Sequence, residues 1–193
     1  MASYAGGSWL HPHASGHAFF ENFWCDLLRQ PAHNGRPNST SVWLGTVGFA
    51  ALAAALALFW WEIADVFRDW RRGFVRWGGL VSSLATAAVA FMPSDRFPAL
   101  HAPVVLLAGG LGFACGCLCS AWGLRHLAVA RVFGSASLLL VSAAAVNLGL
   151  YVWVAYLHGV DTLVLPAAQK VATFALLVWV ASGLAFSASR PKP

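Results

Sequence analysis

The sequence predicts an all-α fold: a polytopic integral membrane helix bundle of about five transmembrane helices, preceded by an N-terminal amphipathic helix. Three observations support this prediction. Of the 193 residues, 59% are hydrophobic and only 10% are charged, whereas a soluble domain carries about 25% charged residues. The apolar runs have about the 20 residues that a helix needs to cross a bilayer. Basic residues lie beside alternate ends of these runs, as in the cytoplasmic loops of membrane proteins.

Five spans are expected along the chain. Each run is rich in Ala, Leu and Gly, whereas the strands of a membrane barrel would be about 10 residues of alternating character. A helix also satisfies its own backbone hydrogen bonds, which the hydrocarbon interior requires. Pro93 ends the second run, because proline cannot continue a helix. The expected spans cover residues 42–67, 74–92, 100–122, 132–157 and 163–186.

The basic residues predict the orientation of the bundle. Three lie on the side of the N-terminal segment, namely Arg29, Arg36 and Arg96. Eight lie on the other side, namely Arg68, Arg71, Arg72, Arg76, Arg125, Arg131, Arg190 and Lys192. Because cytoplasmic loops carry the excess of Lys and Arg, we expect residues 1–40 outside, five spans within 41–187 and a cytoplasmic tail at 188–193. The expected location is a membrane, with the C-terminus on its cytoplasmic side. Basic residues beside apolar runs fit anionic headgroups, so nucleic acid is not an expected partner.

The N-terminal segment contains an amphipathic pattern. Five apolar residues follow the spacing i, i+3, i+4, i+7, i+8, namely Phe20, Phe23, Trp24, Leu27 and Leu28. This spacing predicts a helix over residues 17–29 with one apolar face, lying on the outer leaflet or covering the bundle. Seven tryptophans near the span ends are expected at the headgroup level, where indole is favoured. They are Trp43, Trp60, Trp61, Trp70, Trp77, Trp122 and Trp179.

Lys170 is the most informative single residue, because it lies about two turns inside the last span. An ionisable side chain at that depth is costly and suggests a functional site. It could pair with Asp26, Asp95 or Asp161, or hold a lipid phosphate. The structural alternative is that the side chain extends to the outer interface.

His101 begins the third span at the same outer level, where Asp26 and Asp95 could reach it. A carboxylate–imidazole pair there could perform general acid–base catalysis, so Asp26 and His101 are the catalytic candidates. The pair could equally orient a lipid phosphate or stabilise the bundle. Asn147 in the fourth span is expected to form an interhelical hydrogen bond or to line a solute path with Lys170.

Several classes of site are disfavoured by the sequence. His11, His13 and His17 are close together, but Pro12 and Gly16 make a rigid metal-binding helix unfavourable. There is no phosphate-binding loop, nucleophile elbow or dinucleotide fingerprint. We therefore expect no metal and no cofactor. Glycine-rich helix faces such as Gly112-xxx-Gly116 allow close packing, so a homo-oligomer through these faces is a further expectation.

Three strings precede the first span: YAGGS at 4–8, ENFWCDLL at 21–28 and NGRPN at 34–38. In these strings the chain resembles the bacterial membrane family called domain of unknown function 998, which is similar to the wider Frag1/DRAM/Sfk1 group. The resemblance implies a six-helix bundle with one helix ahead of the Tyr-x-Gly-Gly start, so this chain is expected to lack that first helix. Eukaryotic members of the wider group are linked to membrane-lipid homeostasis, which implies a lipid role.

The leading functional hypothesis is a non-enzymatic protein that interacts with membrane lipids at an outer-leaflet polar site. Asp26, His101 and Lys170 would form this site, because they are ionisable groups expected at one depth. Asp95 and Asn147 are further ligand-binding candidates. The first alternative is an intramembrane hydrolase of lipids that uses the His101 and Asp26 pair. The second is a small-solute transporter.

Overall fold

The computed structural model describes residues 1–157 and 163–189, with the backbone alone at 127–130. Its five long helices are α1 (Ser39–Ile63), α2 (Trp70–Phe91), α3 (Pro98–Arg125), α4 (Leu127–Tyr156) and α5 (Val164–Ala188). Two short 3-10 helices are η1 (Trp24–Leu28) and η2 (Ala64–Val66). Five helices are long and apolar enough to cross a membrane. The predicted all-α fold is therefore confirmed, and the protein is a multi-pass membrane protein.

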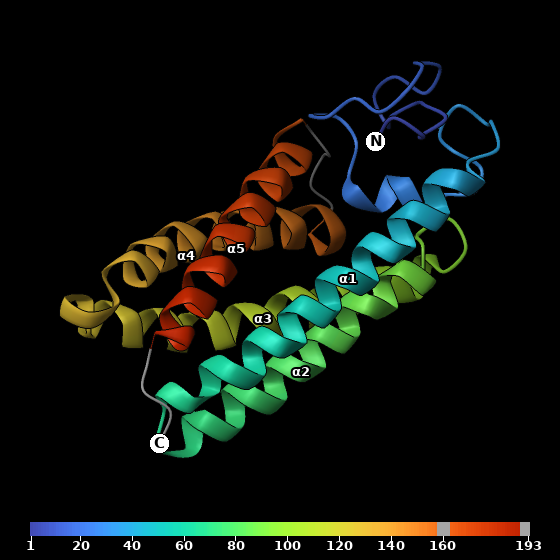
Figure 1. The fold of residues 1–193 in the computed structure, drawn as a ribbon. Helices are drawn as coiled ribbons and strands as arrows, with labels where there is room; N and C mark the ends of the chain where they lie inside the picture. Colours follow the sequence, from blue (N-terminus) through green and yellow to red (C-terminus); the bar gives the residue numbers. More distant parts are fainter. Residues whose placement is uncertain (158–162, 190–193) are drawn as a thin grey trace.

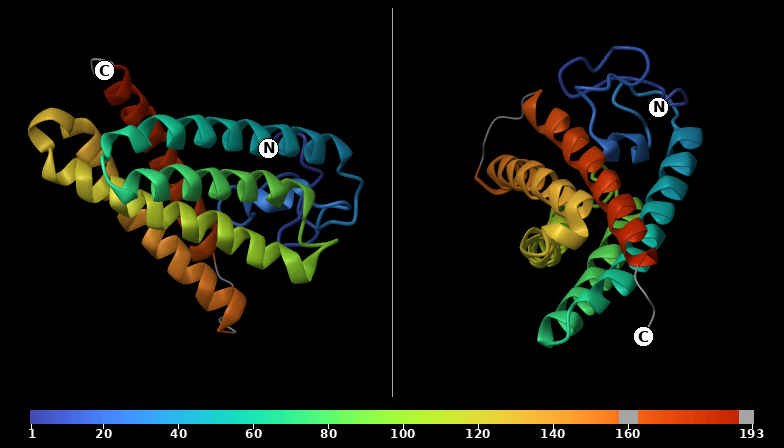
Figure 2. Two further views of the ribbon diagram at one scale, coloured as in Figure 1. Left: turned by 90° about the horizontal axis from the view of Figure 1, so that it is seen from below. Right: turned by 60° about the vertical axis from the view of Figure 1, so that its left-hand side comes forward.

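The helices run up and down in sequence order. Each one packs against the next, and α5 also contacts α1, so the bundle closes into a ring of five. Figure 1 shows the N-terminal segment and the start of α5 at one end, and the end of the described chain near the α1–α2 connection. Figure 2 shows α1 and α2 side by side along most of their length. We call residues 1–38 the cap and the end of the bundle beneath them the cap end.

Local chemistry explains several helix boundaries. The Asp69 carboxylate accepts a hydrogen bond from the Arg71 N–H at 3.0 Å and so caps the first turn of α2. Pro98 occupies the first turn of α3, where a missing N–H costs nothing. The Asp161 site and the tail from residue 190 onward, both part of the sequence prediction, lie outside the described residues.

The core contains a cluster of aromatic rings, which we call the aromatic core, packed among aliphatic side chains. Trp179 lies in the centre, with ring centroids of Phe59 at 4.5 Å, Phe133 at 5.5 Å and Trp60 at 5.6 Å. Its indole N–H donates to the Ser137 hydroxyl at 2.8 Å, so its polar atom is satisfied inside the apolar core. Trp60 and Trp179 were predicted at the membrane interface, but both are buried inside the bundle. Their contacts come from distant helices, which hydropathy does not reveal.

The amphipathic helix predicted over residues 17–29 is not confirmed, since regular helix is limited to η1. Side chains compete with the backbone ladder here. The Ala18 N–H donates to the Asn22 side chain at 2.9 Å, and the Phe23 N–H donates to the Asp26 carboxylate at 2.8 Å. Both bonds fold the segment into tight turns instead of a continuous helix.

Helix packing against α1 depends on a glycine at position 79. A Cβ built there would lie 2.6 Å from the Cβ of Trp60, far inside van der Waals contact. We expect Gly79→Ala to destabilise the bundle by about 1–3 kcal/mol through overpacking, seen as a lower unfolding temperature in detergent. The matched control is Gly48→Ala, whose Cβ would meet nothing within 4 Å. Equal unfolding temperatures for both variants would contradict the packing described for Gly79.

Candidate functional site

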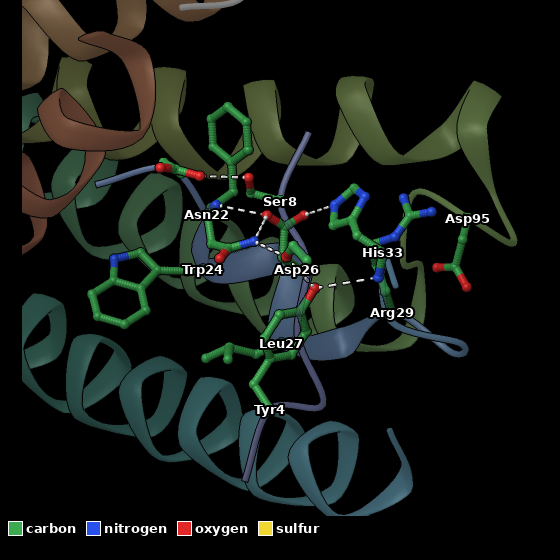
Figure 3. A network of polar contacts seen from close by, with 12 residues as sticks. Tyr4, Ser8, Asn22, Trp24, Asp26, Leu27, Arg29, His33 and Asp95 are labelled. Carbon is green, nitrogen blue, oxygen red and sulfur yellow. Dashed lines mark hydrogen bonds and ion pairs between the residues drawn. The ribbon is translucent and has the colours of Figure 1, made fainter. Parts of the chain in front are cut away.

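The cap is organised around the Asp26 carboxylate, as Figure 3 shows. Asp26 accepts hydrogen bonds from the Phe23 N–H at 2.8 Å, from the Asn22 side chain at 3.0 Å and from the His33 ring at 3.1 Å. The side chains of Asp26 and His33 are only 10% and 14% exposed. This buried carboxylate–imidazole pair joins the two halves of the cap.

Two glycines allow the start of the chain to fold over this network. Gly6 and Gly7 have φ values of 127° and 83°. Residues with a Cβ rarely adopt such positive values. The Gly7 carbonyl accepts hydrogen bonds from the Asn22 side chain at 2.8 Å and from the Tyr4 hydroxyl at 3.2 Å. A Cβ at Gly7 would lie within 3 Å of three neighbouring atoms, and the nearest is the Pro12 carbonyl oxygen at 2.4 Å. The YAGGS and ENFWCDLL strings therefore meet in space through these bonds.

Lys170 fastens the cap to the bundle. The residue is 5% exposed, and its ammonium group donates to the backbone carbonyl of Asn22. The same nitrogen lies 5.0 Å from the ring centroid of Trp24 and 5.6 Å from that of Phe19. Both distances are within cation–π range. The ammonium group thus points into the cap and is held there by a carbonyl and two aromatic faces.

Trp24 docks on α5 beside this lysine. Its backbone N–H donates to the Gln169 side-chain oxygen at 3.0 Å, and its indole N–H donates to the Thr173 hydroxyl at 3.1 Å. The three residues 169, 170 and 173 lie within one turn of α5, so they present one binding face to the cap. The cap is therefore an integral part of the folded protein.

The remaining candidates lie in a second region, at the α2–α3 connection. The His101 ring bonds to the Met92 carbonyl at 2.7 Å, and Asp95 accepts from the Gln30 N–H at 3.1 Å. The imidazole partner of Asp26 in the structure is His33. The structure brings Asp26 and Lys170 together through Asn22. His101 and Asp95 instead bond to Met92 and Gln30.

Asn147 lies in a cavity inside the ring of helices, which we call the bundle cavity. Its volume is about 220 Å³, and all five long helices contribute to its wall. Most of the lining is aliphatic, aromatic or glycine. Its side chains with polar atoms are those of Trp60, Ser82, Thr86, Asn147, Gln169, Thr173 and Trp179. Gln169 and Thr173 also bond to Trp24, so the cap covers the end of the cavity.

The sequence did not single out several residues of this region. His33 and Asn22 are two polar residues among many in the N-terminal segment. The sequence predicted Trp60 as an interfacial anchor and Gly116 as a helix-packing residue. Both line the cavity. Gly116 is buried, but a Cβ built on it would meet nothing within 4 Å. A buried glycine facing empty space marks a cavity, and no sequence pattern reports that space.

Burial and hydrogen bonding set the protonation of the cap. Burial alone raises the pKa of the Asp26 carboxyl, but the bonds from His33, Asn22 and Phe23 outweigh it and hold the pKa below its usual value. Burial, followed by the charge of Lys170, lowers the pKa of His17. In the described structure neither ring nitrogen of His17 has a hydrogen-bond partner. A docked cap therefore favours a neutral His17 and an ionised Asp26.

These shifts predict that acid weakens docking of the cap in two steps. Because the pKa of His17 is lower when docked, the released cap binds more protons, and docking weakens as pH falls below about 6.5. The contribution of Asp26 is present above its ordinary pKa of about 3.9 and is lost as pH falls further. We expect the protection of the amides in residues 1–38 against hydrogen exchange, corrected for the slower intrinsic exchange at lower pH, to decrease between pH 7.5 and 5.5 in the wild type. His17→Phe should remove this first step, whereas His13→Phe, at an exposed position, should keep it. An unchanged first step in His17→Phe would refute the assignment.

The described residues contain no group of three or more His, Cys, Asp or Glu side chains that could hold a metal ion. No family model, curated protein or solved structure matches the chain. The resemblance to domain of unknown function 998 therefore stays a prediction, and functional inference depends on the geometry of the site.

Proposed function

We propose that this protein binds a membrane lipid without chemically modifying it, and that the bundle cavity receives part of the lipid. The observation that carries the proposal is the cavity itself. A void of about 220 Å³ exceeds the ~150 Å³ apolar cavity that binds benzene in an engineered protein. It is large enough for a segment of one lipid, while the rest of the lipid stays in the bilayer.

The character of the wall supports a lipid over a solute. Ligand pockets for apolar molecules are mostly hydrophobic, with a few polar groups that fix orientation. Leu52, Leu56, Leu140 and Leu176 line this cavity together with a small number of neutral polar side chains. A water-filled path for a polar solute would require a more polar wall. For this reason we prefer lipid binding to small-solute transport.

The hydrolase alternative would need its acid–base pair beside the bound lipid. Asp26 and His101 are not among the residues that line the cavity. Their described contacts hold the cap and the α2–α3 connection. In this proposal Asp26 and Lys170 are positioning residues, because they hold the cap over the cavity end where Gln169 and Thr173 lie.

We further propose that the cap lies outside a bacterial inner membrane, with the C-terminus in the cytoplasm. Support comes from the arginines at the end opposite the cap, namely Arg68, Arg71, Arg72, Arg76 and Arg125, and from the positive-inside bias. A reporter fused after Pro193 should be active in the cytoplasm, and one fused before Met1 should be active outside. The reverse result for both fusions would invert the proposed orientation.

Filling the cavity should displace the lipid. In Gly116→Leu the new side chain would occupy open space inside the bundle. We expect native mass spectrometry from mild detergent to show a discrete lipid adduct on the wild type and its loss in this variant. Gly149→Leu is the matched control, because Gly149 is on an exposed helix face and its Cβ would also meet nothing within 4 Å.

Thermal unfolding of both variants checks that the bundle remains folded. Ala144→Leu, at another lining position, provides a second filling variant if Gly116→Leu unfolds. A wild-type protein without adduct in both detergent and lipid nanodiscs, or equal adducts on all variants, would overturn the proposed function.

A further inference from the structure

The wall of the bundle cavity contains two polar atoms that have no partner in the described part of the chain. They are the side-chain oxygen of Asn147 on α4 and the indole nitrogen of Trp60 on α1, both buried. Almost all buried polar groups in proteins are hydrogen-bonded, and an unpartnered one calls for an explanation. In hydrocarbon, no water is available to satisfy it. A bound molecule with polar atoms would supply the missing partners.

The other hydroxyls of the wall are already satisfied. Ser82 donates to the Ala108 carbonyl at 2.7 Å, and Thr86 donates to the Ser82 carbonyl at 2.9 Å. Thr173 donates to the Gln169 carbonyl at 2.8 Å. The two unpartnered atoms are thus distinct from the general pattern of this wall. They are one acceptor, on Asn147, and one donor, on Trp60.

The cavity wall contains no Asp, Glu, Lys, Arg or His side chain among the residues that line it. Lys170 is one residue from Gln169, but its ammonium group points into the cap. An ionised headgroup in this cavity would therefore be buried without an opposite charge, which is strongly unfavourable. The part of the lipid that enters must be neutral.

We propose that the bundle cavity is selective for a neutral lipid with a free hydroxyl, of the diacylglycerol class. Its hydroxyl donates to the side-chain oxygen of Asn147, and a carbonyl oxygen of the lipid accepts from the indole N–H of Trp60. The segment of one acyl chain next to these groups lies along the apolar part of the wall, and the rest of the lipid stays in the bilayer. This inference rests on the proposed lipid-binding function and adds the chemical class of the ligand.

Three lipids with identical acyl chains test the selectivity. They are dioleoylglycerol, its analogue that lacks only the hydroxyl (1,2-dioleoyl-propanediol), and dioleoyl phosphatidic acid, which has a phosphate in place of the hydroxyl. Each is titrated into the full-length protein in phosphatidylcholine nanodiscs, and native mass spectrometry reports the bound fraction. We expect dioleoylglycerol to bind about three- to tenfold more tightly than the deoxy analogue. This ratio corresponds to one hydrogen bond as strong as those between membrane helices. Phosphatidic acid should bind less than dioleoylglycerol.

Variants then assign the contact. Asn147→Leu keeps a side chain of similar size but no polar atom, so the preference for the hydroxyl should fall to about one. Trp60→Phe should weaken both neutral lipids alike, because both retain the ester carbonyls. Val146→Leu, next to Asn147 but exposed, is the matched control and should leave the preference unchanged.

The outcomes separate this inference from the proposed function. Equal binding of dioleoylglycerol and its deoxy analogue to the wild type would refute the hydroxyl contact, while loss of both in Gly116→Leu would still support lipid binding in the cavity. Stronger binding of phosphatidic acid than of dioleoylglycerol would place the ligand at a charged site and refute the neutral class. Failure of every lipid to bind would remove both proposals.

Discussion

The buried ammonium group of Lys170 is the contact on which the cap end depends. A cation away from water needs partners of suitable geometry, and this one has the carbonyl of Asn22 and the faces of Trp24 and Phe19. The Asn22 side chain in turn bonds to Gly7 and Asp26. A single lysine on α5 therefore bonds to the residue that joins Gly7 to Asp26 within the cap.

This arrangement joins the cap to the interior of the bundle. Gln169 and Thr173 accept hydrogen bonds from Trp24 on one side and line the bundle cavity on the other. Any change that releases Trp24 also frees two polar groups at the cavity end. The cap and the wall of the bundle cavity are thus physically connected, because they share the same side chains of α5.

The interior of the bundle contains polar groups with hydrogen-bond partners and others without one. In the aromatic core, Ser137 accepts from Trp179 and donates to the Phe133 carbonyl, so no polar atom of this pair is left over. At the cavity wall, Asn147 and Trp60 keep unpartnered atoms. Polar groups without partners are expensive in a protein core. Both residues line the bundle cavity, and the Trp60 ring also packs in the aromatic core.

The sequence by itself determined the five spans and the all-α fold, because hydropathy and length report whether a segment is stable in hydrocarbon. It also indicated Lys170 as unusual, since a charge within a span is costly. Only the tertiary structure decided the partners: His33 for Asp26, Asn22 for Lys170, and the aromatic core for Trp60. These contacts join residues up to 148 positions apart, and hydrophobic periodicity contains no information about which helix faces meet. The bundle cavity likewise exists only where five helices fail to fill the space between them.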